Sequence, residues 1–112
     1  MNLFITILSF LALTILTDYT GSWGYTVASP DGGTITAEFV FAKENGKYVG
    51  HIAGDEGTLP LKDLKIEGEN FSCNFYYQGY RVNLKGAFKG DVLNCTGSAE
   101  GYEFPIVAKK KK

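Results

Sequence analysis

The stretch FSCNFYYQGYRVNLKGAF occupies residues 71–88 and decides the fold. Apolar and polar side chains alternate on both sides of Gln78-Gly79, as they do in two half-buried strands joined by a tight turn. The period of two places Phe71, Phe75 and Leu84 on one face of this hairpin. Residues 71–88 therefore predict an antiparallel sheet with one apolar face.

The same unit repeats along the chain from Gly21 to Lys109, and no helical pattern interrupts it. Gly-rich turns separate the runs, and Asn45-Gly46 forms the strongest hairpin signal among them. In the fourth run the alternation slips between Leu61 and Leu64, which indicates a β-bulge. We predict eight strands: Ser22–Ser29, Thr34–Lys43, Lys47–Ala53, Thr58–Glu67, Phe71–Tyr77, Tyr80–Phe88, Val92–Ser98 and Tyr102–Ala108.

Eight sequential strands with one apolar face can form either a sandwich or a closed barrel. The short connections favour a meander, and closure removes the exposed strand edges that would recruit other chains. Glycines inside the strands, at Gly50, Gly86 and Gly97, are typical of a sharply coiled barrel wall. We therefore predict an all-β fold with a single eight-stranded antiparallel up-and-down (meander) barrel over residues 18–109.

A hydrophobic N-terminal signal segment is predicted before the barrel. Residues 3–17 carry no charged side chain and are too short to span a bilayer comfortably. Residues 1–17 are interpreted as a signal peptide, with a short membrane anchor or a packed N-terminal helix or strand as alternatives. A signal peptide predicts a secreted protein or one of the periplasm or cell envelope, which meets a membrane only through this segment, and only if the segment is not removed. Residues 110–112 are predicted to be a basic tail.

The charge balance argues against nucleic acid as a partner. Four of the eleven basic residues are Lys109–Lys112, so residues 1–108 carry seven basic side chains against twelve acidic ones. Nucleic-acid binding requires clustered Lys and Arg to meet the phosphates, and a mildly acidic barrel offers no such cluster. The sequence predicts no nucleic-acid partner.

The residues that carry catalytic or metal chemistry are sparse. His51 is the single histidine and is predicted to face solvent, and no serine lies in a nucleophile elbow. Cys73 and Cys95 lie on strands separated by one other strand, roughly 9–10 Å apart at ordinary strand spacing. A disulfide requires a Cα separation below about 7 Å, so we expect two buried, unpaired thiols. We predict no enzyme activity, no metal site and no cofactor.

The alternation also divides the side chains between the interior and the surface. Trp23, Phe39, Phe75 and Leu84 point inward, whereas Asn74 points outward. The number of inward aromatic residues favours a filled core over a deep cup, with any pocket shallow and at one mouth. Four inward tyrosines are candidate ligand-binding residues at that mouth, unless their hydroxyls merely reach solvent at the rims: Tyr25, Tyr48, Tyr77 and Tyr102.

Gly21-Ser22-Trp23, at the start of the first strand, resembles the Gly-x-Trp opening of the lipocalins and avidins, the calycin group of ligand-binding barrels. The whole of residues 20–109 also resembles small secreted β-barrel domains of bacteria. The resemblance implies that Gly21 and Trp23 are structural, with Trp23 plugging the barrel floor. It also implies a basic residue from the last strand across the indole ring, which we assign to Lys109 although lipocalins use Arg.

These features predict a non-catalytic exported β-barrel, monomeric, that binds a small apolar or amphipathic ligand at a barrel mouth. The alternative is a solid structural or interaction module. Such a module would contact a protein, a glycan or the envelope surface through its outer face.

Overall fold

The computed structural model describes residues 18–28, 32–55 and 57–111, which form one all-β antiparallel sheet. The predicted signal segment, residues 1–17, lies outside the described residues, as does Lys112. Within the described ranges, no helix is long and apolar enough to cross a membrane. The strands are β1 Gly21–Ala28, β2 Thr34–Glu44, β3 Lys47–Gly54, β4 Gly57–Pro60, β5 Lys62–Glu67, β6 Asn70–Tyr77, β7 Tyr80–Lys89, β8 Val92–Ala99 and β9 Tyr102–Lys110.

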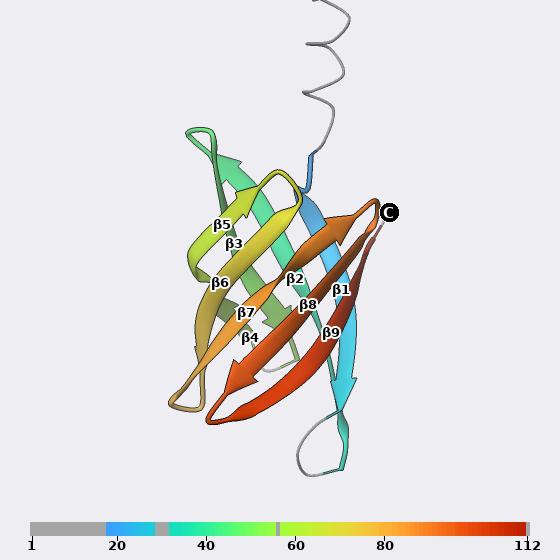
Figure 1. The fold of residues 1–112 in the computed structure, drawn as a ribbon, viewed down its shortest axis with the longest axis vertical. Coiled ribbons are helices and arrows are strands. Elements are labelled where there is room, and N and C mark those ends of the chain that lie inside the picture. The colour runs from blue at the N-terminus through green and yellow to red at the C-terminus, as the bar shows by residue number, and fades with distance from the viewer. Residues whose placement is uncertain (1–17, 29–31, 56, 112) are drawn as a thin grey trace, which may run out of the picture.

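The sheet curls into a nearly closed barrel (Figure 1). Each strand pairs with its neighbour along the chain, except that β1 also pairs with β9 and β4 does not pair with β5. The order of the strands around the sheet is therefore β4-β3-β2-β1-β9-β8-β7-β6-β5. The meander predicted from the sequence is confirmed, but the barrel has nine strands and not eight.

The additional strand arises at the slip in alternation that the sequence shows near Leu61. The fourth predicted run splits there, so that β4 pairs with β3 and β5 pairs with β6. The backbone N–H of Leu61 still donates to the carbonyl oxygen of Gly50 on β3, at 3.0 Å. One continuous run of chain thus changes partners midway and brings the two edges of the sheet together.

A β-bulge in β5 buries one side chain that was predicted to be exposed. The register of β5 against β6 shifts between Lys62 and Lys65, and Asp63 adopts a φ of 54°. Asn74, predicted to face solvent, is only 5% exposed, and its Nδ2 donates to Oδ2 of Asp63 at 2.9 Å. Asn74 keeps the outward side of β6 that the alternation predicts, but it is not exposed, because the bulge brings the Asp63 carboxylate to its amide and so satisfies a side chain that burial alone would penalise.

The two ends of the barrel differ. Figure 1 shows the turns β2–β3, β5–β6 and β7–β8 at one end, with the C-terminus beside them. We call this the closed end, because β1 begins there and Trp23 is fully buried. The turns β6–β7 and β8–β9 lie at the opposite end, which we call the open end.

Candidate functional site

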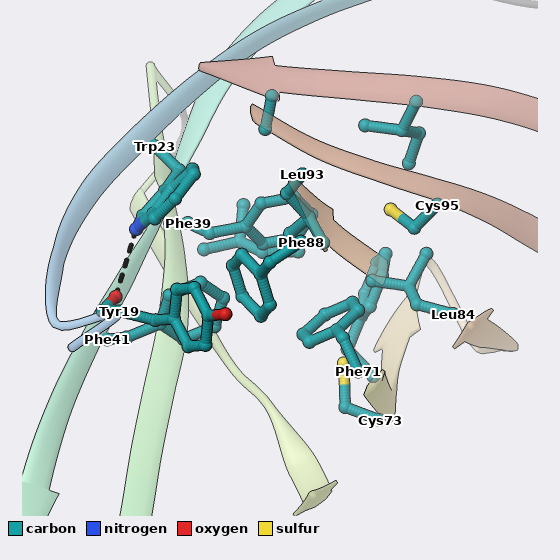
Figure 2. Close-up of a cluster of buried hydrophobic side chains, with 14 of the residues drawn as sticks. Tyr19, Trp23, Phe39, Phe41, Phe71, Cys73, Leu84, Phe88, Leu93 and Cys95 are labelled. Carbon is teal, nitrogen blue, oxygen red and sulfur yellow. Dashed lines mark hydrogen bonds between the residues drawn. The ribbon is translucent and has the colours of Figure 1, made fainter. Parts of the chain in front are cut away.

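An aromatic cluster fills the closed end of the barrel (Figure 2). Phe88 lies at its centre, where its ring stacks on Tyr19 with centroids 3.9 Å apart and meets the edge of Trp23 at 5.0 Å. Phe41 and Phe71 pack on Phe88 in T-shaped geometry at 6.0 and 5.8 Å. These contacts make the closed end the packed aromatic core of the barrel.

Tyr19 completes this cluster, and the sequence analysis did not identify it. Its carbonyl oxygen accepts a hydrogen bond of 3.0 Å from Nε1 of Trp23, and its backbone N–H donates to the hydroxyl of Tyr48 at 3.2 Å. Tyr19 precedes β1, so the alternation within strands carries no signal for its burial. The segment before β1 therefore covers the closed end and fixes the polar edge of the indole.

Gly21 and Trp23 lie at the start of β1, at the closed end of the barrel. Gly21 begins β1 with a φ of +119°, a conformation that residues with a Cβ rarely adopt. This turn of the backbone lets the chain pass from Tyr19 over the closed end and then down the barrel wall, while Trp23 points into the core.

The cation over Trp23 is Lys110, and the assignment to Lys109 was wrong. Nζ of Lys110 lies 5.8 Å from the centroid of the indole ring, whereas Lys109 is exposed. Ala108 is fully buried, so the alternation along β9 turns Lys109 outward and Lys110 inward. The contact has the geometry of a cation–π interaction.

The basic residues at the C-terminus are part of the barrel wall. β9 includes Lys110, and the backbone N–H of Lys111 donates to the carbonyl oxygen of Ser22 at 2.8 Å. Nζ of Lys111 forms an ion pair with Glu38 on β2. The hydrogen bond that Nζ of Lys111 donates to Oε1 of Glu38 lowers the pKa of that carboxyl below its usual value. Lys110 and Lys111, predicted as a tail, instead anchor β9 to β1 and β2.

A cavity of about 470 Å³ lies at the open end. It is lined by residues from β1, β2, β3, β4, β6, β7 and β9, so most of the barrel wall contributes to it. Its apolar and aromatic side chains include Tyr25, Ile52, Phe75, Tyr77, Val82 and Phe104. Its polar side chains are Thr34, Thr36, Asp55, Thr58 and Gln78. Ligand pockets in proteins typically enclose about 300–1,000 Å³ and have mostly apolar walls with a few polar groups.

Two of the four predicted tyrosines meet at this cavity. Tyr25 is half-buried and packs on Phe39 with ring centroids 4.8 Å apart, and burial raises the pKa of Tyr25 to about 12. Tyr77 lies at the rim with 36% of its surface exposed. Tyr25 therefore presents a neutral phenol to the cavity at physiological pH, and Tyr77 an accessible ring.

The other two tyrosines lie elsewhere. Tyr48 is at the closed end, where its hydroxyl accepts from Tyr19 and Nζ of Lys43 lies 4.9 Å from its ring centroid. Tyr102 is 77% exposed and does not line the cavity, so its predicted place in the ligand-binding mouth was wrong. Its side chain is on the same face of β9 as the inward Phe104. Because Tyr102 is the first residue of β9, next to the β8–β9 turn, it lies at the end of the barrel and stays exposed.

The polar residues of the cavity were not predicted. Thr34, Asp55, Thr58 and Gln78 all lie in or next to turns, where the alternation of strands assigns no direction. These residues share one feature that the sequence does show: every second turn of a meander lies at the same end of the barrel. The order of the turns therefore predicts which residues lie together at one end, but not which end holds a cavity.

Cys73 on β6 and Cys95 on β8 are free thiols on either side of β7, each 6% exposed. Figure 2 shows both beside the aromatic cluster. Burial raises the pKa of each thiol to about 12. Among the residues in the three described ranges, no group of three or more His, Cys, Asp or Glu side chains could hold a metal ion.

The buried thiols predict a loss of stability at alkaline pH. An unfolded thiol ionises near pH 9, whereas the folded thiols stay protonated up to about pH 12. The unfolded state alone loses protons between these values, so the free energy of unfolding falls as the pH rises through them. From pH 8 to pH 10 we expect a loss of about 1 kcal/mol for each thiol.

Urea unfolding of the natural protein and of a Cys73→Ala/Cys95→Ala variant, at both pH values, measures this effect. The variant should lose about 2 kcal/mol less than the natural protein, because it has no thiol to ionise. Tyr25 titrates in both proteins and cancels in the comparison. Equal losses in the two proteins would contradict the prediction.

The fold places His51 half-buried on β3, between Val40 of β2 and Pro60 of β4. The absence of enzyme activity stays a prediction. No protein-family model, no curated protein and no solved structure matches this chain.

Proposed function

We propose that this chain is an exported, non-catalytic, lipocalin-like barrel that binds a small apolar or amphipathic molecule in the open-end cavity. The observation that carries the proposal is the contrast between the two ends. The closed end is filled by stacked aromatic rings, whereas the open end holds a cavity of about 470 Å³. The uncharged residues 3–17 support export, and the buried Trp23 under Lys110 supports the likeness to lipocalins.

The lining of the cavity supports the class of ligand. Ile52, Phe75 and Val82 are buried core residues that also form its floor, so an apolar body placed there leaves water for an apolar surface. At about 30 Å³ for each water in the liquid, the cavity holds on the order of fifteen waters that a ligand would displace. Thr34, Thr58 and Gln78 at the rim can then hydrogen-bond the polar end of an amphipathic molecule.

The test is a titration with N-phenyl-1-naphthylamine, a neutral dye whose fluorescence rises in apolar surroundings. We expect saturable binding at one site for each chain. Tyr77→Ala should weaken binding about tenfold, because it removes one aromatic wall worth about 1–2 kcal/mol of apolar burial. Tyr77 is partly exposed, so the variant should remain folded.

Two further variants control this titration. Tyr102→Ala removes an equally large ring from the same end that does not line the cavity, and it should leave the dye affinity within about twofold of the natural value. Ala37→Phe, which adds a ring inside the cavity, should abolish binding. Absence of saturable binding, or equal effects of the two tyrosine substitutions, would overturn the proposal.

A second function, an interaction module, is favoured by the exposed tyrosines. Tyr76, Tyr80 and Tyr102 are 50%, 54% and 77% exposed, and they lie near the β6–β7 and β8–β9 turns. Exposed tyrosines are enriched in protein interfaces because each ring offers a large contact area with a polar tip. If the dye does not bind, the interaction module becomes the favoured function.

A further inference from the structure

We propose that the ligand of the open-end cavity carries a positive charge on its polar end, and so belongs to the amphipathic amines. The proposal rests on the proposed function, since it names the class of molecule that the same cavity would take. Three features of the cavity lead to it: its charge, the position of that charge, and the rings around it.

The charge of the lining has one sign. Among the described residues that line the cavity, Asp55 alone has a charged side chain, and none is Lys, Arg or His. Arg81, near the same end on β7, is exposed and does not line the cavity. Lys110 and Lys111 lie at the other end, where they contact Trp23 and Glu38. The Asp55 carboxylate therefore attracts a cationic group at the mouth and repels an anionic one.

The position of Asp55 suits an amphipathic ligand. Asp55 follows Gly54 in the β3–β4 turn and is exposed, so its carboxylate stays hydrated at the rim, above the apolar floor formed by Ile52 and Phe75. A ligand with an apolar body in the cavity would place its polar end at this rim. An ammonium group there keeps part of its own water and avoids the desolvation that a buried ion pair requires.

The aromatic lining favours the same sign of charge. Tyr25, Phe75, Tyr77 and Phe104 all contribute to the wall. The face of an aromatic ring carries partial negative charge and attracts cations, most strongly where water is partly excluded. Rings and carboxylate thus act in the same direction, whereas no described lining side chain carries a positive charge that would attract an anion.

The experiment displaces N-phenyl-1-naphthylamine with three ten-carbon chains that differ only in the polar end: decylammonium, decan-1-ol and decanoate. All are used at pH 7, decylammonium and decanoate below the concentrations at which they form micelles and decan-1-ol below its solubility limit. We expect decylammonium to bind about tenfold more tightly than decanoate, with decan-1-ol between them. The preference should shrink in high salt, because Asp55 is exposed and its field is screened.

Two charge-matched variants assign the effect to Asp55. In Asp55→Asn the ratio of decylammonium to decanoate affinity should fall to about twofold or less. Asp91→Asn changes the net charge equally but lies in the β7–β8 turn at the closed end, where the backbone carbonyl of Asp91 accepts from Lys110. This variant should keep the natural ratio.

The outcomes separate the two proposals. If the dye binds but the three chains compete equally, or decanoate competes best, the amine inference is overturned and the ligand cavity stands. If Asp91→Asn lowers the ratio as much as Asp55→Asn, the preference comes from the overall charge and the assignment to Asp55 is overturned. If neither the dye nor any chain binds, the proposed function itself fails.

Discussion

Replacing Phe88 with alanine is expected to lower the free energy of unfolding by about 3–5 kcal/mol, the usual range for removing a large buried aromatic side chain. Phe88 is fully buried, and its ring touches four others of the closed-end cluster. The rings of Tyr19 and Trp23 come from before and within β1, whereas Phe88 comes from β7. The substitution therefore opens a void between distant parts of the chain that no nearby side chain can fill.

Urea unfolding followed by Trp23 fluorescence and by far-ultraviolet circular dichroism measures this loss. Small domains have a total stability of only about 5–15 kcal/mol, so the variant should unfold at a much lower urea concentration. Tyr76→Ala is the control, since it removes an aromatic ring that is half exposed on β6 and should change stability by about 0.5 kcal/mol or less. A loss below about 1 kcal/mol for Phe88→Ala would show that the closed end is not the packed core of the barrel.

Replacing Gly86 with alanine is expected to cost about 3 kcal/mol, although the change adds a single methyl group. A Cβ at this position would overlap the carbonyl oxygen of Asn94 and the backbone of Cys95 on the paired strand β8. A side chain could rotate away, but these are backbone atoms held in the β7–β8 ladder. The ladder must open, or one strand must shift, to accept the methyl group.

Gly54→Ala is the matched control for this substitution. An added Cβ at Gly54 would lie 3.4 Å from the Cβ of Ala37, an ordinary contact, and the residue is not among the glycines with positive φ. Alanine there restricts the unfolded chain and should leave stability unchanged or raise it by about 0.5 kcal/mol. Equal unfolding midpoints for the two variants would contradict the close approach of β7 and β8.

The mid-strand glycines show how far a pattern in the sequence extends. Gly50, Gly86 and Gly97 were predicted from their positions inside strands, as places where the wall coils sharply. In the structure each makes room for a specific neighbour: Phe41 and Leu61 at Gly50, the β8 backbone at Gly86, and the Phe104 ring at Gly97. The need for glycine was visible in the chain, but the neighbour that requires it was not, because it lies on another strand.

The structure divides the four tyrosines that the sequence analysis named as candidates. Tyr25 and Tyr77 line the cavity, while Tyr48 serves the closed end and Tyr102 stands exposed in solvent. All four share the inward parity of their strands. Alternation along a strand predicts which face of the sheet a side chain occupies. It does not predict whether neighbouring strands extend far enough to bury that side chain.

The amino-acid order alone predicted an all-β meander, its turns and the apolar face of most strands, but not the division of the fourth run into β4 and β5, because alternation and turn chemistry are properties of a few consecutive residues. It also marked Leu61 as an irregular point and Trp23 as a core residue. Three features required strands that are distant in the chain to meet: the change of partner from β3 to β6, the place of Lys110 over Trp23, and the choice of which end is packed and which is hollow. Local alternation bears on the first two, since it turns Lys110 inward and marks the slip at Leu61, but which strands pair and which end is packed depend on contacts between residues far apart in the chain.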